Sequence, residues 1–166
     1  MSVAVPTSLP ADVVRLAHLM DCAVELVPAQ VVKSPLGLRL NYVLRGGAAE
    51  GERVRGRFLP GGGDWCVVGS DGVGRLDIRA TIETDDGELV YARFDGLASI
   101  PRDVTARLAA GERARWDEVF MRSMARFETG AARYAWLNGV FAVGIHDLGP
   151  SDGETWRVAH HVFEVL

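Results

Sequence analysis

The sequence predicts an all-β protein in which about eight or more antiparallel strands form a sandwich or close into a barrel, with one short helix. Apolar and polar residues alternate along several segments, which is typical of strands with one buried face. The 19 glycines and 7 prolines favour turns and short strands over long helices. The 166 residues suffice for one domain. We expect this domain over residues 16–166, after an N-terminal extension over residues 1–15.

Alternation identifies four segments in the first half of the chain. The first covers residues 16–26, where apolar side chains fall on even positions and acidic ones on odd positions. Residues 36–44 alternate in the same way, as do residues 54–58 and 76–82. Each segment therefore has one apolar and one polar face. The polar face of the third segment is basic, and we interpret it as solvated or facing another subunit. It carries Arg53, Arg55 and Arg57.

Turns divide the later strands. Asp85-Asp86-Gly87 predicts a hairpin turn between strands over residues 76–84 and 88–98. In the C-terminal third, two more strands are expected at about residues 138–147 and 155–165, joined by a polar turn.

One segment breaks the alternation. It begins with Pro101 and Asp103 and ends at Gly111, which are the residue types that favour a helix start and a helix end. The sequence therefore predicts one short helix, or lid, near residues 101–110.

Composition and charge exclude several classes of protein. The formal net charge of −4 disfavours a broad positive surface, so no nucleic-acid partner is expected. The most apolar long window, residues 13–32, is interrupted by charged residues and is not expected to span a membrane. Because the N-terminus has no secretory pattern, the expected location is cytoplasmic. In that compartment Cys22 and Cys66 are expected to be free thiols.

The common cofactor and metal signatures are absent from the sequence. There is no phosphate-binding loop, no HExxH, no GxSxG and no dinucleotide-binding loop. His160 and His161 point to opposite faces of one strand and cannot both bind one ion, while His18 and His146 stand alone. We therefore expect neither a cofactor nor a metal.

The first candidate site residues follow a glycine triplet. Residues 61–63 are all glycine, and Asp64 and Trp65 come directly after them. Glycines allow unusual backbone angles or a close approach to a ligand. The motif therefore indicates either a small-molecule contact or a tight barrel corner, with Asp64 capping loop amides and Trp65 in the core.

A second candidate pair is Asp77 and Arg79. Residues i and i+2 of a strand share a face, so the carboxylate and the guanidinium point the same way. On an inner face, Arg79 would keep Asp77 ionised or bind a carbonyl or anionic group. On an outer face, the pair would be an ordinary surface salt bridge.

A third cluster lies between residues 128 and 138. Glu128 is a candidate acid or base, and Asn138 is a candidate hydrogen-bond donor to a developing negative charge. We place Trp136 and Asn138 on one strand face from their spacing, with Tyr134 nearby. The alternative has Trp136 in the core and Asn138 in a turn. Asp86 is either a turn residue or leans over the barrel mouth.

Several of these residues belong to a longer pattern that resembles a known family. The pattern runs through Gly56–Trp65, Leu76–Arg79 and Thr84–Gly87, and continues in Arg126–Thr129 and Tyr134–Asn138. It is similar to the bacterial family called domain of unknown function 3237, over roughly residues 16–165. The extended N-terminus and Gly139 depart from that pattern.

The resemblance implies a fold and an assembly, and no particular chemistry. The implied fold is a single closed antiparallel β-barrel of about eight or more strands, which we expect to close by pairing the first and last strands. The implied assembly is a homodimer or small homo-oligomer. Such a barrel leaves two positions open for the polar side chains of the strands, which face either solvent or a water-containing lumen.

The leading functional hypothesis is a cofactor-independent enzyme that transfers protons on a small, partly apolar carbonyl compound in a barrel pocket. Its class would be lyase, dehydratase, isomerase or cyclase. The acid/base candidates are Asp64, Asp77 and Glu128. The groups that stabilise negative charge would be Arg79 and Asn138. The substrate-binding candidates are Trp65, Asp86, Tyr91, Tyr134 and Trp136.

Two alternatives remain open on the sequence. One is a non-catalytic barrel that binds a small molecule, and the other is an interaction protein with a filled core. The catalytic hypothesis expects seven residues to converge on one pocket. It depends on Asp77 and Arg79, and the binding barrel is favoured instead if these two lie on the outer face. The seven are Asp64, Trp65, Asp77, Arg79, Glu128, Trp136 and Asn138.

Overall fold

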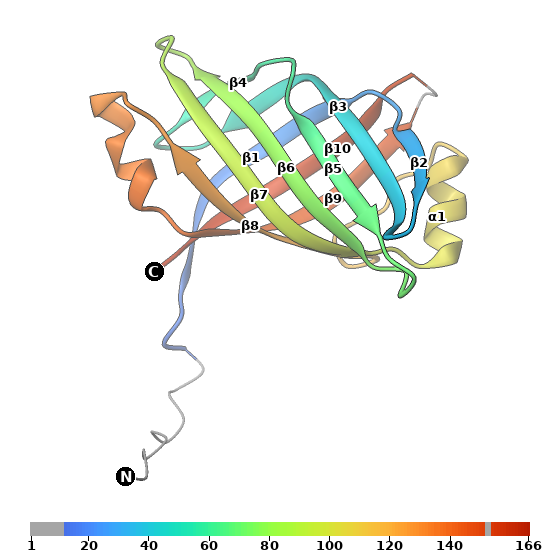
Figure 1. The fold of residues 1–166 in the computed structure, drawn as a ribbon. Coiled ribbons are helices and arrows are strands. Elements are labelled where there is room, and N and C mark those ends of the chain that lie inside the picture. Colours follow the sequence, from blue (N-terminus) through green and yellow to red (C-terminus); the bar gives the residue numbers. More distant parts are fainter. Residues whose placement is uncertain (1–11, 152–153) are drawn as a thin grey trace, which may run out of the picture.

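Ten strands form one antiparallel sheet that closes into an eight-stranded barrel with two additional strands (Figure 1). The computed structural model describes residues 12–151 and 154–166. Two short helices complete the fold, α1 (Arg102–Ala109) and the 3-10 helix η1 (Ala132–Gly139). The strands are β1 (Leu16–Leu26), β2 (Gln30–Ser34), β3 (Gly37–Glu50), β4 (Arg55–Phe58), β5 (Gly63–Val68), β6 (Gly74–Thr84), β7 (Leu89–Ser99), β8 (Phe120–Glu128), β9 (Ala142–Ser151) and β10 (Trp156–Val165).

The barrel closes through β1, which pairs with β10 on one side and with β3 on the other. The predicted pairing of the first and last strands is therefore confirmed. One additional strand arises because one position of the barrel, between β3 and β6, is shared by two short strands, β4 and β5. The other is β2, which pairs with the part of β3 that β1 does not reach.

The apolar face of each alternating segment points into the barrel. In β6, for example, Leu76 and Ile82 are buried, whereas Arg79 is exposed. The alternation of β1 contains one irregularity that the sequence did not predict. At a register shift between His18 and Met20, His18 is exposed and the consecutive residues Leu19 and Met20 are both buried. Burial of the apolar faces of the barrel strands supplies the core, whereas the additional strand β2 is mostly exposed.

Several elements differ from the sequence prediction. Three strands, β2, β5 and β8, were not identified by the sequence analysis. Residues 132–139 form the helix η1, so β9 begins at Ala142 rather than at about residue 138. Placing Trp136 and Asn138 on one strand face was therefore wrong. The predicted short helix is confirmed as α1, and η1 is a second one.

The two helices cover opposite ends of the barrel (Figure 1). Val104 and Leu108 of α1 are buried, as are Tyr134 and Leu137 of η1. The described residues contain no helix that is both long and apolar enough to cross a membrane.

Candidate functional site

The barrel interior is hollow beneath α1. A cavity of about 430 Å³ lies there, between α1 and the inner faces of β3, β5, β6 and β10. This volume is within the range of small-molecule pockets. Gly72, Ile100 and Thr105 border the cavity and are exposed, so it reaches the surface at the edge of α1. The cavity is evidence against the filled core that the interaction-protein alternative requires.

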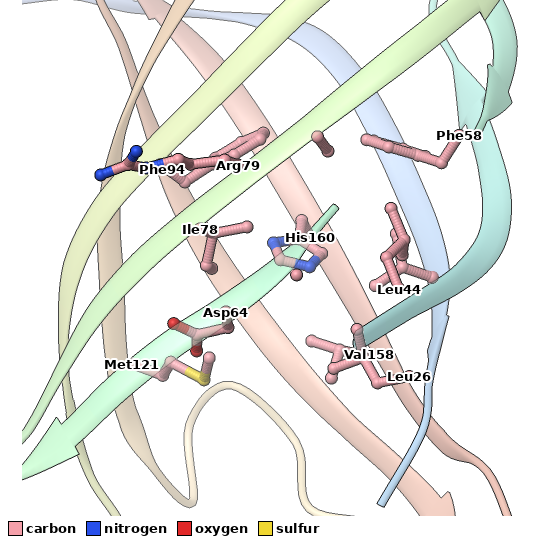
Figure 2. Close-up of a pocket in the computed structure, with 13 residues that line it drawn as sticks. Leu26, Leu44, Phe58, Asp64, Ile78, Arg79, Phe94, Met121, Val158 and His160 are labelled. Carbon is pink, nitrogen blue, oxygen red and sulfur yellow. The ribbon is translucent and has the colours of Figure 1, made fainter. Parts of the chain in front are cut away.

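A smaller chamber of about 40 Å³ adjoins the cavity in the middle of the barrel (Figure 2). Its lining is apolar except for Asp64, His160 and Arg79, and the guanidinium of Arg79 points away from the other two in Figure 2. Leu26, Asp64, Met121 and Val158 border both spaces. Asp64 therefore lies where the cavity and the chamber meet.

Asp64 is the carboxyl group in the walls of both spaces. It is the second residue of β5, and its side chain is only 7% exposed. Its Oδ1 accepts a hydrogen bond from the backbone N–H of Asp77 at 3.1 Å. Burial raises the pKa of Asp64 to about 7, although that hydrogen bond acts in the opposite direction. Near neutral pH, Asp64 can therefore accept or donate a proton.

The glycine triplet has a structural role that explains the position of Asp64. Gly61 has a φ of +106°, in the region that glycine adopts readily. A side chain at Gly62 would overlap the carbonyl oxygen of Arg79, and one at Gly63 would overlap that of Tyr42. The triplet thus lets β5 approach both neighbouring strands closely. The sequence analysis offered a small-molecule contact or a tight barrel corner for this motif. The glycines form the tight corner, and Asp64 points into the barrel.

A buried histidine pair was missed by the sequence analysis. His146 is fully buried and His160 is 6% exposed, and their ring centroids lie 4.5 Å apart. His146 Nε2 and the hydroxyl of Ser123 share a hydrogen bond of 2.9 Å. Burial lowers the pKa of His160 to about 4 and holds that of His146 well below its usual value, so both rings are neutral at pH 7.

The sequence analysis could not have paired these two histidines. The strands expected at about residues 138–147 and 155–165 centre their turn near residue 151, which would place His146 opposite about residue 156. In the structure β9 extends to Ser151, which pairs with Trp156, so His146 faces His160 across β9 and β10. Treating His146 as a lone residue was therefore wrong.

Asp77 and Arg79 lie on the outer face of the barrel. Arg79 donates two hydrogen bonds of 3.0 Å to the Asp77 carboxylate, from Nε to Oδ1 and from an Nη to Oδ2. The two side chains are 36% and 49% exposed. The possibility that this pair is desolvated in a lumen was therefore wrong, because the apolar residues of β6 occupy the inner face.

Trp65 and Tyr91 also lie outside. Together with Arg79 they border an outer groove of about 340 Å³ beside the glycine triplet. Trp65 is 39% exposed, which excludes the placement in the core that the sequence left open. These aromatic residues do not contribute to the wall of the interior cavity.

The third predicted cluster belongs to the end of the barrel that η1 covers. Asp86 accepts hydrogen bonds from the Tyr134 hydroxyl at 2.7 Å and from Arg133 at 3.0 Å. Asn138 forms two hydrogen bonds with the backbone of Thr129, at 2.8 and 3.0 Å. These contacts hold the loop and η1 in place.

The remaining two residues of that cluster do not reach the interior either. The guanidinium of Arg53 lies 3.5 Å from the ring centroid of Trp136, and Glu128 is exposed. The expectation that seven residues converge on one pocket was therefore wrong. Of the seven, only Asp64 extends its functional group into the interior.

The described residues contain no group of three or more His, Cys, Asp or Glu side chains suited to hold a metal ion. Fold and site together define a small closed β-barrel with an apolar interior pocket and one protonatable carboxyl in its wall. The chain matches the family model "Protein of unknown function (DUF3237)" over residues 14–165, and it belongs to that family.

The comparisons extend from sequences to solved structures. A UPF0311 protein of Rhodopseudomonas palustris is 32% identical over 108 residues, which cover 65% of this chain and 71% of that protein. A crystal structure from the same species, of a conserved protein of unknown function, has a TM-score of 0.82 at 25% identity and covers 94% of this chain and 100% of that one.

A β-barrel-like protein of Acinetobacter baumannii has a TM-score of 0.74 at 28% identity, over 96% of this chain and 100% of that one. The crystal structure of an enzyme from Penicillium herquei shares the fold, with a TM-score of 0.66 at 22% identity, over 97% of this chain and 100% of that one.

Proposed function

We propose that the protein is a cofactor-independent enzyme that transfers a proton on a small, neutral, partly apolar carbonyl compound held inside the barrel. Its reaction class is lyase, dehydratase, isomerase or cyclase. Asp64 is the acid/base group. The observation that carries this proposal is the position of the Asp64 carboxyl, which borders both the cavity and the chamber among apolar side chains.

The electrostatics of the pocket support this role. A general acid or base works best when its pKa lies near the working pH. Burial, with a smaller contribution from the charge of Asp77, brings the pKa of Asp64 to about 7. A carboxylate in apolar surroundings is also a stronger base than one in water, because its charge is poorly solvated. The Penicillium herquei protein is called an enzyme, which is compatible with catalysis on this fold.

The test uses a neutral aromatic probe, 5-nitrobenzisoxazole, whose ring opens when a base removes its carbon-bound proton. The electron pair of the C–H bond forms the nitrile, the N–O bond breaks, and 2-cyano-4-nitrophenolate is released. The proton passes to Asp64 and then to water. The coloured product gives the rate directly. The rate is expected to rise as the pH passes through about 7, where Asp64 ionises.

Asp64→Asn is expected to reduce this rate by at least ~100-fold, the usual loss for a general base. The matched control is Asp95→Asn, the same change at a carboxylate that pairs with Arg93 on the outer face. It is expected to keep the wild-type rate. If Asp64→Asn retains the rate, or the wild type does not exceed the buffer rate, the acid/base proposal is wrong.

A non-catalytic binding barrel is the second candidate. It is favoured by the apolar lining, in which aliphatic side chains outnumber polar groups. The neutral fluorophore N-phenyl-1-naphthylamine distinguishes the two. Bound probe without ring opening of the benzisoxazole would support binding alone, and Leu108→Trp, which fills the cavity from α1, is expected to abolish the fluorescence increase.

A further inference from the structure

The chamber beside Asp64 is too small for a ring or chain but large enough for one polar group. Its volume of about 40 Å³ corresponds to two or three water molecules. The cavity of about 430 Å³ that adjoins it can hold the body of a small molecule. The two spaces together therefore match a ligand with an apolar body and one short polar end.

One polar group of the chamber lacks a partner. Within residues 12–151 and 154–166, Nδ1 of His160 has no hydrogen-bond partner, although the ring is almost completely buried. The Asp64 carboxyl borders the same chamber, and the hydrogen bond that it accepts from Asp77 is made to Oδ1. Buried polar groups in native proteins are nearly always paired with protein, ordered water or ligand. The His160 nitrogen therefore points to a hydrogen-bonding occupant.

The charge of the lining selects the kind of occupant. The cation nearest the chamber, Arg79, is held by Asp77 on the outer face, and His160 is neutral at pH 7. An anion placed here would meet no positive charge and would be repelled by Asp64 when ionised. A neutral oxygen, by contrast, can accept from or donate to both side chains.

We infer that the chamber between Asp64 and His160 binds the oxygen of a neutral hydroxyl or carbonyl group, while the apolar remainder of the ligand lies in the cavity under α1. This inference rests on the proposed function in using the same pocket, and it names the ligand class. His160 is a positioning residue in this scheme, and proton transfer belongs to Asp64.

The test compares three fluorescent probes on the full chain at pH 7. They are 2-naphthol, 2-methylnaphthalene, which has a methyl group in place of the hydroxyl, and the anion 2-naphthoate. The wild type is expected to bind 2-naphthol at least ~10-fold more tightly than 2-methylnaphthalene, the effect of about one net hydrogen bond. 2-Naphthoate is expected to bind more weakly than both.

Substitutions then locate the preference. His160→Phe is expected to lose most of the preference for 2-naphthol, because only Asp64 remains to bond the hydroxyl, whereas His160→Gln, which keeps hydrogen-bonding atoms, retains the preference. The matched control is His161→Phe, one residue along β10, because His161 bonds Asp21 and Asp147 on the opposite face. This control is expected to behave like the wild type. If His160→Phe does not fold, the three-probe comparison on the wild type and His160→Gln decides alone.

Equal affinity of the wild type for the two neutral probes would overturn the inference, as would binding of neither. Tighter binding of 2-naphthoate, or of the cation 2-naphthylmethylammonium, would overturn it too. A preference for 2-naphthol that is undiminished in His160→Phe would have the same consequence. These outcomes are independent of the ring-opening assay, because they require binding only. Loss of catalysis with the 2-naphthol preference intact would therefore refute the proposed function and leave the inference standing.

Discussion

At the scale of single residues, the chamber places one acid and one neutral imidazole in surroundings that shift both pKa values. Burial disfavours the charged form of each group, so it raises the pKa of Asp64 to about 7 and lowers that of His160 to about 4. The two groups therefore affect the stability of the fold in opposite directions as the pH changes.

The first prediction concerns Asp64 and rising pH. Its pKa is about 7 in the folded chain and 3.8 for a solvated carboxyl, so the folded state binds the proton more tightly. Stability from this group is present at low pH and is lost as the pH rises toward 7. Relative to the wild type, Asp64→Asn is expected to gain ~1.4 kcal/mol per pH unit between about pH 4.5 and 6.5. Urea unfolding at several pH values measures this, and a difference that does not vary with pH would contradict it.

The second prediction concerns His160 and acid. Its pKa is about 4 when folded and 6.5 for a solvated imidazole, so the unfolded chain binds the proton more tightly. Stability is then present above pH 6.5 and is lost as the pH falls toward 4. His160→Gln is expected to lose less stability than the wild type between pH 6.5 and 4.5. Melting temperatures at both pH values test this, and an equal loss in variant and wild type would speak against it.

At the scale of elements, alternation made most strands predictable, because each has an apolar face that must be buried. The strand containing residues 76–82 was identified for this reason, and the same alternation also assigns Asp77 and Arg79 to the outside once the barrel is known to be apolar within. The sequence of one strand shows which residues share a face, but it does not show whether the polar or the apolar face lines the lumen.

Other elements could not be predicted for physical reasons. The inner face of β8 includes Ser123 and Ala125 beside Met121 and Phe127, which weakens its apolar alternation. The helix η1 has only Tyr134 and Leu137 buried, so it carries little periodic signal. The chamber requires Asp64 of β5 and His160 of β10, whose meeting depends on barrel closure. Asp64 was therefore predictable as a candidate, and its partner was not.

The third prediction tests how the β4–β5 corner positions Asp64. In Gly63→Ala, the added methyl group would overlap the carbonyl oxygen of Tyr42, so β5 must move away from β3. We expect a loss of at least ~2 kcal/mol in the free energy of unfolding. Gly139→Ala, where no heavy atom lies within 4 Å of the new methyl group, is expected to change it by less than ~0.5 kcal/mol. Thermal unfolding of both variants compares them, and equal melting temperatures would refute the tight approach.

At the scale of the whole molecule, closure removes most free strand edges and leaves the outer wall as the surface for other contacts. Leu97 of β7 lies opposite Arg122 of β8, which places it diagonally between Phe120 and Met124. These three apolar side chains are 43–53% exposed. Their contiguity on neighbouring strands gives an apolar patch that a second copy of the chain would cover in a two-fold contact.

The last prediction is that the chain self-associates as a dimer or small ring through this patch. Placing a positive charge at Leu97, directly opposite Arg122 and Arg75 on the two neighbouring strands, would bury it in the contact among like charges, at a cost that a small interface cannot offset. Leu97→Lys is therefore expected to give the mass of a single chain in light scattering at micromolar concentration. The wild type, and a control with Leu89→Lys at the far end of β7, where the side chain is similarly exposed, are expected to give at least twice that mass. A wild-type chain that scatters as a monomer would refute self-association. An oligomer unaffected by Leu97→Lys would place the contact elsewhere on the wall.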